Sequence, residues 1–175
     1  MTLDLDWIDG RIGEAWSGEV PDGSHINVVL ARRGSATAAS ATTALACPTP
    51  GHAPVVVCLG AGNAVRPATV MLNKATALPG SHERLTWGAA QLGIGQGVMD
   101  AVDEGLLPAD QAGEIVLLVA VWVDPGARDE TAVRLANRDA MLVAIRDALS
   151  GSPAERVREI ADMRETATNA FYGGD

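Results

Sequence analysis

The sequence is short of several residue types, and each shortage excludes a class of protein. Aromatic residues make up only 3% of the 175 residues, and there are two cysteines, Cys47 and Cys58. Two cysteines are too few for a disulfide framework and lack metal-site spacing, so we expect buried free thiols. No apolar run approaches the roughly 18 residues of a transmembrane helix. The acidic first residues do not resemble a signal peptide, so we expect a cytoplasmic protein.

Positive charge is also scarce. The formal net charge is −9, which disfavours binding to nucleic acid or to an anionic membrane surface. Of the 13 basic residues, Lys74 is the only lysine. The pKa of a lysine amine shifts on burial, whereas a guanidinium stays charged. Lys74 is therefore either a site residue or an ordinary surface lysine near a strand end.

The apolar pattern predicts one domain of the α/β (α+β) class. Hydrophobic residues make up 47% of the chain, enough for a sizeable core. Strands are predicted at residues 11–19, 24–32, 55–59, 67–76 and 114–123, and helices at 34–46, 81–106, 129–150 and 153–170. Their order predicts a two-layer sandwich, with a mixed sheet packed by helices. We expect an N-terminal extension at residues 1–10 and the domain at residues 11–170.

Several details of this prediction can be checked in the structure. Pro21-Asp22-Gly23 predicts the turn of a hairpin, and Ser35 and Ser81 are candidate helix caps. In the first strand, Ile12 and either Ala15 or Trp16 should face inward. Strand 55–59 should be buried and strand 114–123 central. The inward stripe of helix 81–106 should contain Leu85, Ala89, Leu92, Gln96 and Met99.

His25 is the histidine best placed for proton transfer, because it opens an apolar strand directly after a turn. Its side chain should share one strand face with Asn27, while Ile26 and Val28 share the other. An imidazole titrates near neutral pH, so it can give or take a proton. A hydrogen-bonded structural histidine is the alternative. We expect His82 to face solvent, and no partner is evident for His52.

Other catalytic motifs are missing. There is no nucleophile elbow and no phosphate-binding Walker loop. Gly60-x-Gly62 lacks the third glycine and the following helix of a dinucleotide-binding loop. The three histidines lack the spacing of metal ligands.

Five stretches resemble the formaldehyde-activating enzymes over about residues 11–152. They are Ile12-Gly13-Glu14-Ala15, His25-Ile26 after its turn, Pro67-Ala68-Thr69-Val70-Met71-Leu72-Asn73-Lys74-Ala75-Thr76, Gly88-Ala89-Ala90-Gln91 and Leu107-Pro108-Ala109-Asp110-Gln111-Ala112, together with Asn63. The resemblance implies a two-layer α/β fold, a cytoplasmic homopentamer and no metal. It also implies a lyase that condenses formaldehyde with tetrahydromethanopterin to the methylene adduct and water. The pterin is then a co-substrate, with no tightly bound cofactor.

The resemblance also implies residue roles. His25 matches the proton donor of the family, and the substrate-binding positions match Asn27, Val56, Lys74, Thr76 and Gln91. Val56 stands for a leucine, which is a conservative change.

Asn27 stands for an aspartate, so a charge beside the proton donor is lost. Removing such an electrostatic partner costs on the order of 10² in rate. The chain therefore either activates formaldehyde, on tetrahydromethanopterin or a related pterin or amine, or is a non-catalytic paralogue that binds a pterin or an aldehyde-derived ligand.

Overall fold

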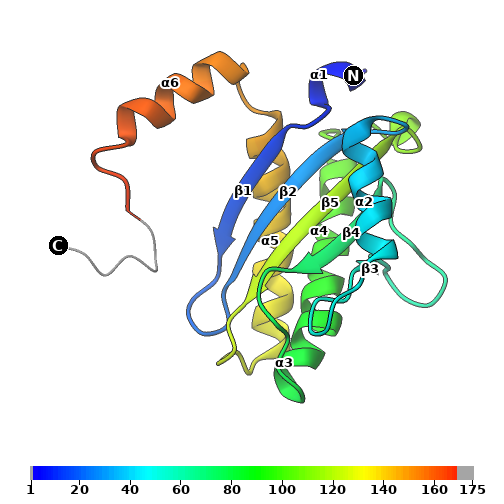
Figure 1. Cartoon of the computed structure of the whole chain (residues 1–175), viewed down its shortest axis with the longest axis vertical. Coiled ribbons are helices and arrows are strands. Elements are labelled where there is room, and N and C mark those ends of the chain that lie inside the picture. The colour runs from blue at the N-terminus through cyan, green and yellow to red at the C-terminus, as the bar shows by residue number, and fades with distance from the viewer. Residues whose placement is uncertain (1, 169–175) are drawn as a thin grey trace.

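The fold is built on a five-stranded mixed sheet, seen in a computed structural model that describes residues 2–168 (Figure 1). The strands are β1 Ile12–Ser17, β2 Ser24–Arg32, β3 Val55–Val56, β4 Ala68–Asn73 and β5 Ile115–Val123, in the order β1-β2-β5-β4-β3. β4 and β5 are parallel, and the other neighbouring pairs are antiparallel. The mixed sheet and the central position of β5 are confirmed.

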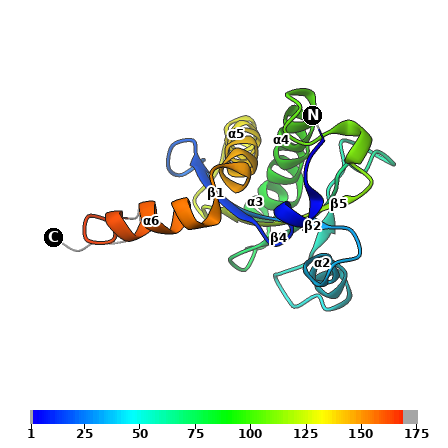
Figure 2. The ribbon, with the colours of Figure 1, turned by 90° about the horizontal axis from the view of Figure 1, so that it is seen from above.

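The helices lie mainly on one face of the sheet. They are α1 Leu5–Ile8, α2 Ala36–Ala46, α3 Ser81–Arg84, a π-helical turn Leu85–Ala90, α4 Gln91–Asp103, a 3-10 turn Ala109–Gln111, α5 Glu130–Leu149 and α6 Pro153–Met163. Figure 2 shows α4 and α5 on one side of the sheet, α2 on the other, and α6 projecting away. Ile8, in the region predicted as an extension, is fully buried in the core. Residues 169–170 of the predicted last helix and domain lie outside the described residues.

Within residues 2–168, no helix combines the length and hydropathy that crossing a membrane requires.

The first hairpin is confirmed, but its inward face differs from the prediction. Ile12 is 65% exposed and Trp16 points outward, whereas Ala15 is buried. The cause is Gly13, because a Cβ at this position would overlap the backbone of Ala144 on α5. A helix can approach this closely only over glycine, so Gly13 and Ala15 take the inward face and their neighbours the outward one.

The predicted helix 81–106 is interrupted, and its inward stripe is only partly as predicted, because Leu85 is buried while Ala89 and Met99 are only partly buried against the core. Its buried apolar residues are Leu85, Ala90, Ile94, Val98 and Ala101, while Leu92 is 37% exposed. The π-helical turn at 85–90 adds a residue to the repeat, and this moves the buried face by one position. The N-cap is Gly80, at φ 98°, and Ser81 is not the cap.

Three other local predictions are wrong. His82 is buried, where its Nδ1 accepts from the Leu78 N–H and its Nε2 donates to the Val123 carbonyl. Cys47 is exposed and Cys58 is partly exposed. Strand 55–59 shrinks to the edge strand β3 at Val55–Val56, after which the Val57 N–H still donates to the Thr69 carbonyl of β4. Ser35 does cap α2, accepting from the Ala38 N–H.

Glycine also sets the spacing of α4 and α5. An added Cβ at Gly97 would lie 2.5 Å from the Arg138 carbonyl oxygen and 2.8 Å from the Met141 Cβ. By contrast, a Cβ at Gly88 would meet no heavy atom within 4 Å. A methyl group would therefore clash with α5 at Gly97 but fit freely at Gly88.

Gly97→Ala should lower the free energy of unfolding by about 1–3 kcal/mol, because the two helices must move apart. Gly88→Ala is the matched control and should leave it unchanged or raise it by up to ~1 kcal/mol, through helix propensity. Urea denaturation measures both. Equal effects at the two positions would contradict the close approach of α4 and α5.

Candidate functional site

A cluster of polar side chains lies on the sheet face opposite α4 and α5. Glu14 comes from β1 and pairs with Asn27 on β2, while Trp16 pairs with His25. Their alternate neighbours, such as Ile26, are buried in the core, so these four side chains point the other way. The turn at residues 18–23 thus brings a carboxylate, an amide and an imidazole together from two short strands.

His25 is held between an acid and an amine. Its Nε2 lies 2.9 Å from Glu14 Oε1, and its Nδ1 lies 3.0 Å from Lys74 Nζ. A carboxylate only accepts hydrogen bonds, so Nε2 carries the proton and donates a hydrogen bond to Glu14. In the neutral imidazole, Nδ1 then accepts from the lysine. The predicted proton donor and the single lysine of the chain are therefore direct partners.

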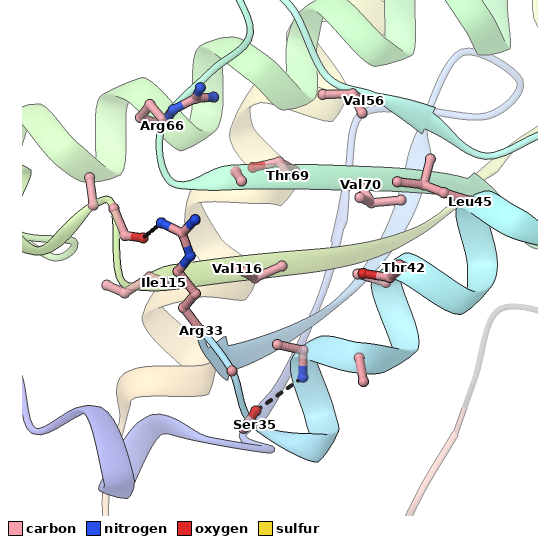
Figure 3. A pocket seen from close by; sticks show the side chains of 17 residues that line it. Arg33, Ser35, Thr42, Leu45, Val56, Arg66, Thr69, Val70, Ile115 and Val116 are labelled. Carbon is pink, nitrogen blue, oxygen red and sulfur yellow. Dashed lines mark hydrogen bonds between the residues drawn. The ribbon is translucent and has the colours of Figure 1, made fainter.

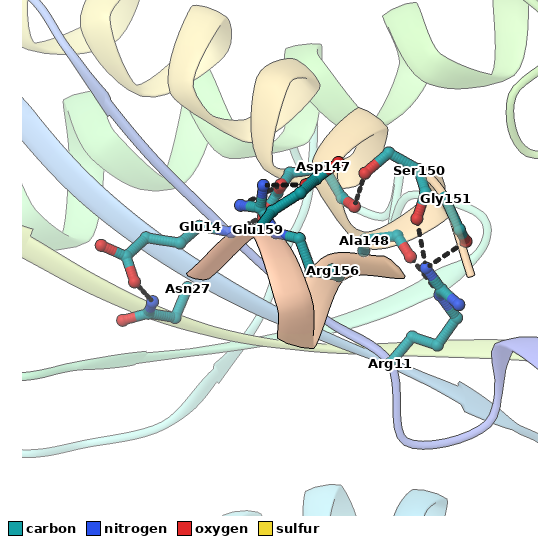
Figure 4. Close-up of polar contacts among 9 residues, drawn as sticks. All are labelled: Arg11, Glu14, Asn27, Asp147, Ala148, Ser150, Gly151, Arg156 and Glu159. Atoms are coloured by element: carbon teal, nitrogen blue, oxygen red, sulfur yellow. Dashed lines mark hydrogen bonds and ion pairs between the residues drawn. The ribbon is translucent and has the colours of Figure 1, made fainter. Parts of the chain in front are cut away.

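Glu14 also holds the residue that departs from the family pattern. The Asn27 amide nitrogen donates to Glu14 Oε2 over 3.2 Å, as Figure 4 shows. The Glu14 N–H in turn donates to Asp147 Oδ2 of α5 over 3.0 Å. The Glu14 carboxylate therefore bonds both His25 and Asn27, and the Glu14 backbone bonds α5.

Burial lowers the pKa of Lys74 from 10.5 to about 8, and the charge of Glu14 opposes this by favouring the ammonium. Lys74 directly follows the last residue of β4, and its side chain is only half-buried. Its backbone N–H continues the sheet by donating to the Val121 carbonyl. The backbone of Lys74 is thus held by the sheet, and the pKa of its amine lies near neutral pH.

Aromatic rings border the cluster. The Trp16 ring centroid lies 5.5 Å from that of Trp122 and 6.3 Å from that of His25. Trp16 is 38% exposed, so part of this aromatic surface is open. Flat apolar rings beside proton-transfer groups suit a planar heterocycle.

Thr76 lies beyond the end of its predicted strand, because β4 ends at Asn73. Its hydroxyl lies 3.2 Å from His52 Nε2, and His52 Nδ1 donates to the Asn73 carbonyl over 3.0 Å. His52, for which no partner was evident in the sequence, thus orders the loop that carries Thr76. Thr76 lies next to the cluster in sequence but belongs to a separate hydrogen-bond group.

Val56 and Gln91 lie at the far edge of the sheet. Gln91 begins α4, and its Oε1 accepts from the Cys58 N–H over 3.3 Å. Val56 is 45% exposed on β3 and lines a groove of about 550 Å³ beside α2 (Figure 3). β3 is three strand spacings from β2, which is about 14 Å. The structure therefore gathers His25, Asn27 and Lys74, and separates Val56 and Gln91 from them.

Sequence reasoning assigned no role to Glu14, Trp16 or Trp122. The hairpin turn contained a signal for two of them, because a hairpin centred on residues 18–23 places Glu14 opposite Asn27 and Trp16 opposite His25. Nothing in the sequence alone placed Trp122 next to Trp16, since this requires the pairing of β2 with β5. Within residues 2–168, no group of three or more His, Cys, Asp or Glu side chains is arranged to hold a metal ion.

Comparison with known proteins gives a consistent set of relatives. The model of the formaldehyde-activating enzyme (Fae) family matches residues 12–172. The chain is 34% identical over 171 residues to the 5,6,7,8-tetrahydromethanopterin hydro-lyase of Methanosarcina barkeri, covering 98% of this chain and 95% of that protein. It is 30% identical over 143 residues to the bifunctional enzyme Fae/Hps of Archaeoglobus fulgidus, and spans 36% of that longer protein.

Glu14→Gln should shift the titration of Lys74 to lower pH, below the pKa of about 8, because the carboxylate that favours the ammonium is gone. A sample labelled with ¹³C in lysine gives one side-chain spectrum to follow by NMR, since the chain has one lysine. Glu19→Gln, an exposed acid of the same hairpin, should leave the titration unchanged. A higher pKa of Lys74 in Glu14→Gln would contradict the effect of the Glu14 charge on Lys74.

Proposed function

The chain belongs to the formaldehyde-activating enzyme family, and from this premise we propose that it condenses formaldehyde with tetrahydromethanopterin, or a related reduced pterin or amine. The products are the methylene adduct and water, and the pterin is a co-substrate. The observation that carries the proposal is the imidazole of His25, held between the Glu14 carboxylate and the Lys74 amine. We also propose that the protein works in the cytoplasm.

The reaction needs an acid and a negative charge. An amine nitrogen adds to formaldehyde and gives a carbinolamine, whose hydroxyl must be protonated before water can leave. His25 is the acid that the site offers. The iminium that forms is positive, and a nearby carboxylate stabilises it more than it stabilises the neutral carbinolamine. Glu14 is the ionisable carboxylate bonded to His25, so we assign it this role.

This assignment changes the meaning of Asn27. From the sequence, loss of an aspartate at this position suggested a slow or inactive enzyme. Glu14 supports an active one, because its carboxylate bonds both His25 and Asn27. The Asn27 amide donates a hydrogen bond that holds the carboxylate in place, and we propose that Asn27 helps to position Glu14.

We expect Glu14→Gln to lower kcat for condensation on the order of 10², since the charge beside the forming cation is removed. Asn27→Asp should change kcat much less, because it adds a second carboxylate next to one already present. The measurement is the rate of methylene-tetrahydromethanopterin formation above the uncatalysed background, with Glu19→Gln as a control. A large gain in Asn27→Asp, with no loss in Glu14→Gln, would show that the charge must come from position 27.

The separation of the predicted binding residues supports a homo-oligomer, and the resemblance suggests a pentamer. The distance from β2 to β3 is about 14 Å, which exceeds the length of a bicyclic pterin ring, so the ring cannot contact both His25 and Val56 of one chain. We propose that Val56 and Gln91 of a neighbouring subunit complete the site that contains His25, Asn27, Lys74 and Thr76.

Two inactive variants should therefore restore each other. His25→Ala and Gln91→Ala are each expected to lose activity alone, and mixed oligomers made by co-expression should recover a fraction of wild-type activity. Each variant's melting temperature serves as the folding control. If mixed oligomers form but remain inactive, each site lies within one chain.

A further inference from the structure

We propose that Lys74 is a covalent carrier of formaldehyde, whose amine takes up the aldehyde carbon and passes it to the acceptor amine. The inference rests on the proposed function, because it takes formaldehyde as the substrate. Its geometric basis is the row of three groups Lys74, His25 and Glu14, joined by contacts of 3.0 Å and 2.9 Å. A nucleophile in hydrogen-bond contact with a base, which a third group orients, is the general arrangement for covalent catalysis.

The tautomer of His25 suits the role of base. Because Nε2–H donates to Glu14, Nδ1 is free to accept a proton from Lys74. The neutral amine donates one N–H to Nδ1 and keeps its lone pair free for attack on the carbonyl carbon. The imidazolium formed by this proton transfer is stabilised by the Glu14 carboxylate. Glu14 is thus a positioning residue, and Lys74 is the nucleophile.

The steps balance without an oxidant or a reductant. A C–N bond forms between Nζ and formaldehyde as the carbonyl electron pair moves to oxygen, which takes a proton from solvent, while the ammonium proton moves to His25. His25 then protonates the hydroxyl, the C–O bond breaks, and water leaves an iminium at Lys74. The acceptor amine adds to the iminium carbon, and its N–H proton moves to the Lys74 nitrogen. The C–N bond to Lys74 then breaks, and the second acceptor nitrogen closes the methylene adduct and releases its proton to solvent, which restores the proton taken up in the first step. Lys74 leaves as a free amine.

Both nitrogens of His25 are occupied, and this favours the indirect route. A direct transfer from His25 to a carbinolamine on the pterin requires the substrate to displace Glu14 or Lys74. A carbinolamine formed on Lys74 itself keeps the contact with Glu14, because its hydroxyl oxygen is two bonds away from Nζ and takes the place of Nζ at Nδ1.

The state of the amine is consistent with this role. Burial lowers the pKa of Lys74 to about 8, against the partial opposition of the Glu14 charge. At pH 7, about a tenth of such an amine is unprotonated, against about one in three thousand for a lysine of unshifted pKa. The other basic side chains of the chain are arginines, which stay protonated, so Lys74 is the one lysine amine that meets formaldehyde.

Reductive trapping tests the proposal. The protein is incubated briefly with formaldehyde and cyanoborohydride at pH 7, and methylation is located by peptide mass spectrometry. The matched control is Arg158→Lys, which adds an exposed amine on α6 to the same molecule. Lys74 should be methylated at least on the order of 10² faster than the added amine, as its larger unprotonated fraction predicts. Glu14→Gln should raise the unprotonated fraction of Lys74, so its trapping rate is compared per unprotonated amine. On that scale the variant should slow trapping at Lys74 but not at position 158, because the His25 imidazolium loses its carboxylate partner.

The outcomes separate this inference from the proposed function. If wild-type protein catalyses condensation while Lys74 is trapped no faster than the added amine, and Lys74→Arg keeps the wild-type kcat, the covalent role is wrong and the function stands. If Lys74 is trapped fast but no pterin or amine acceptor is condensed, the proposed function fails together with the transfer step, and only the uptake of formaldehyde by Lys74 stands. Fast trapping together with loss of kcat in Lys74→Arg, at an unchanged melting temperature, is the result expected.

Discussion

The contact between α5 and Gly13 is the constraint on which the site depends. Because the helix backbone lies directly over this glycine, no other side chain fits there, and β1 has only one possible orientation. Strand alternation then places Glu14 on the opposite face, and the pairing with β2 brings Asn27 and His25 beside it. Asp147 of α5 accepts the Glu14 N–H and pairs with Arg156 of α6, so the helix that sets the orientation also fixes the position.

Local patterns were enough to predict much of this arrangement. The turn and the apolar alternation predicted β2 over residues 24–32 and placed His25 and Asn27 on one face, as observed. The errors arose where a tertiary contact overrides the local pattern. The inward face of β1 depends on α5, and the buried face of α4 depends on a π-helical turn that periodicity assuming 3.6 residues per turn cannot detect. His82 is polar and was expected to face solvent, yet it is buried because both of its ring nitrogens form hydrogen bonds with the backbone.

The same distinction applies to the site. Lys74 stands out as a candidate site residue because it is the only lysine, which the composition alone shows. Its contact with His25 could not be predicted, because the two residues are 49 positions apart and meet only through the pairing of β2, β5 and β4. Val56, Thr76 and Gln91 were assigned by resemblance, and in the described residues they lie outside the bonded cluster of Glu14, His25, Asn27 and Lys74.

Asn27 and Glu14 are best understood as a pair. An aspartate at position 27 would bring two carboxylates to about the distance of the present hydrogen bond, where their like charges repel. The asparagine amide instead supplies an N–H at that place, which donates to Glu14 Oε2. The substitution therefore removes one charge formally while keeping the one that faces His25. Since the Glu14 side chain is 64% exposed, its effect on a cation will be strongest when a bound ring or a neighbouring chain excludes water from the site.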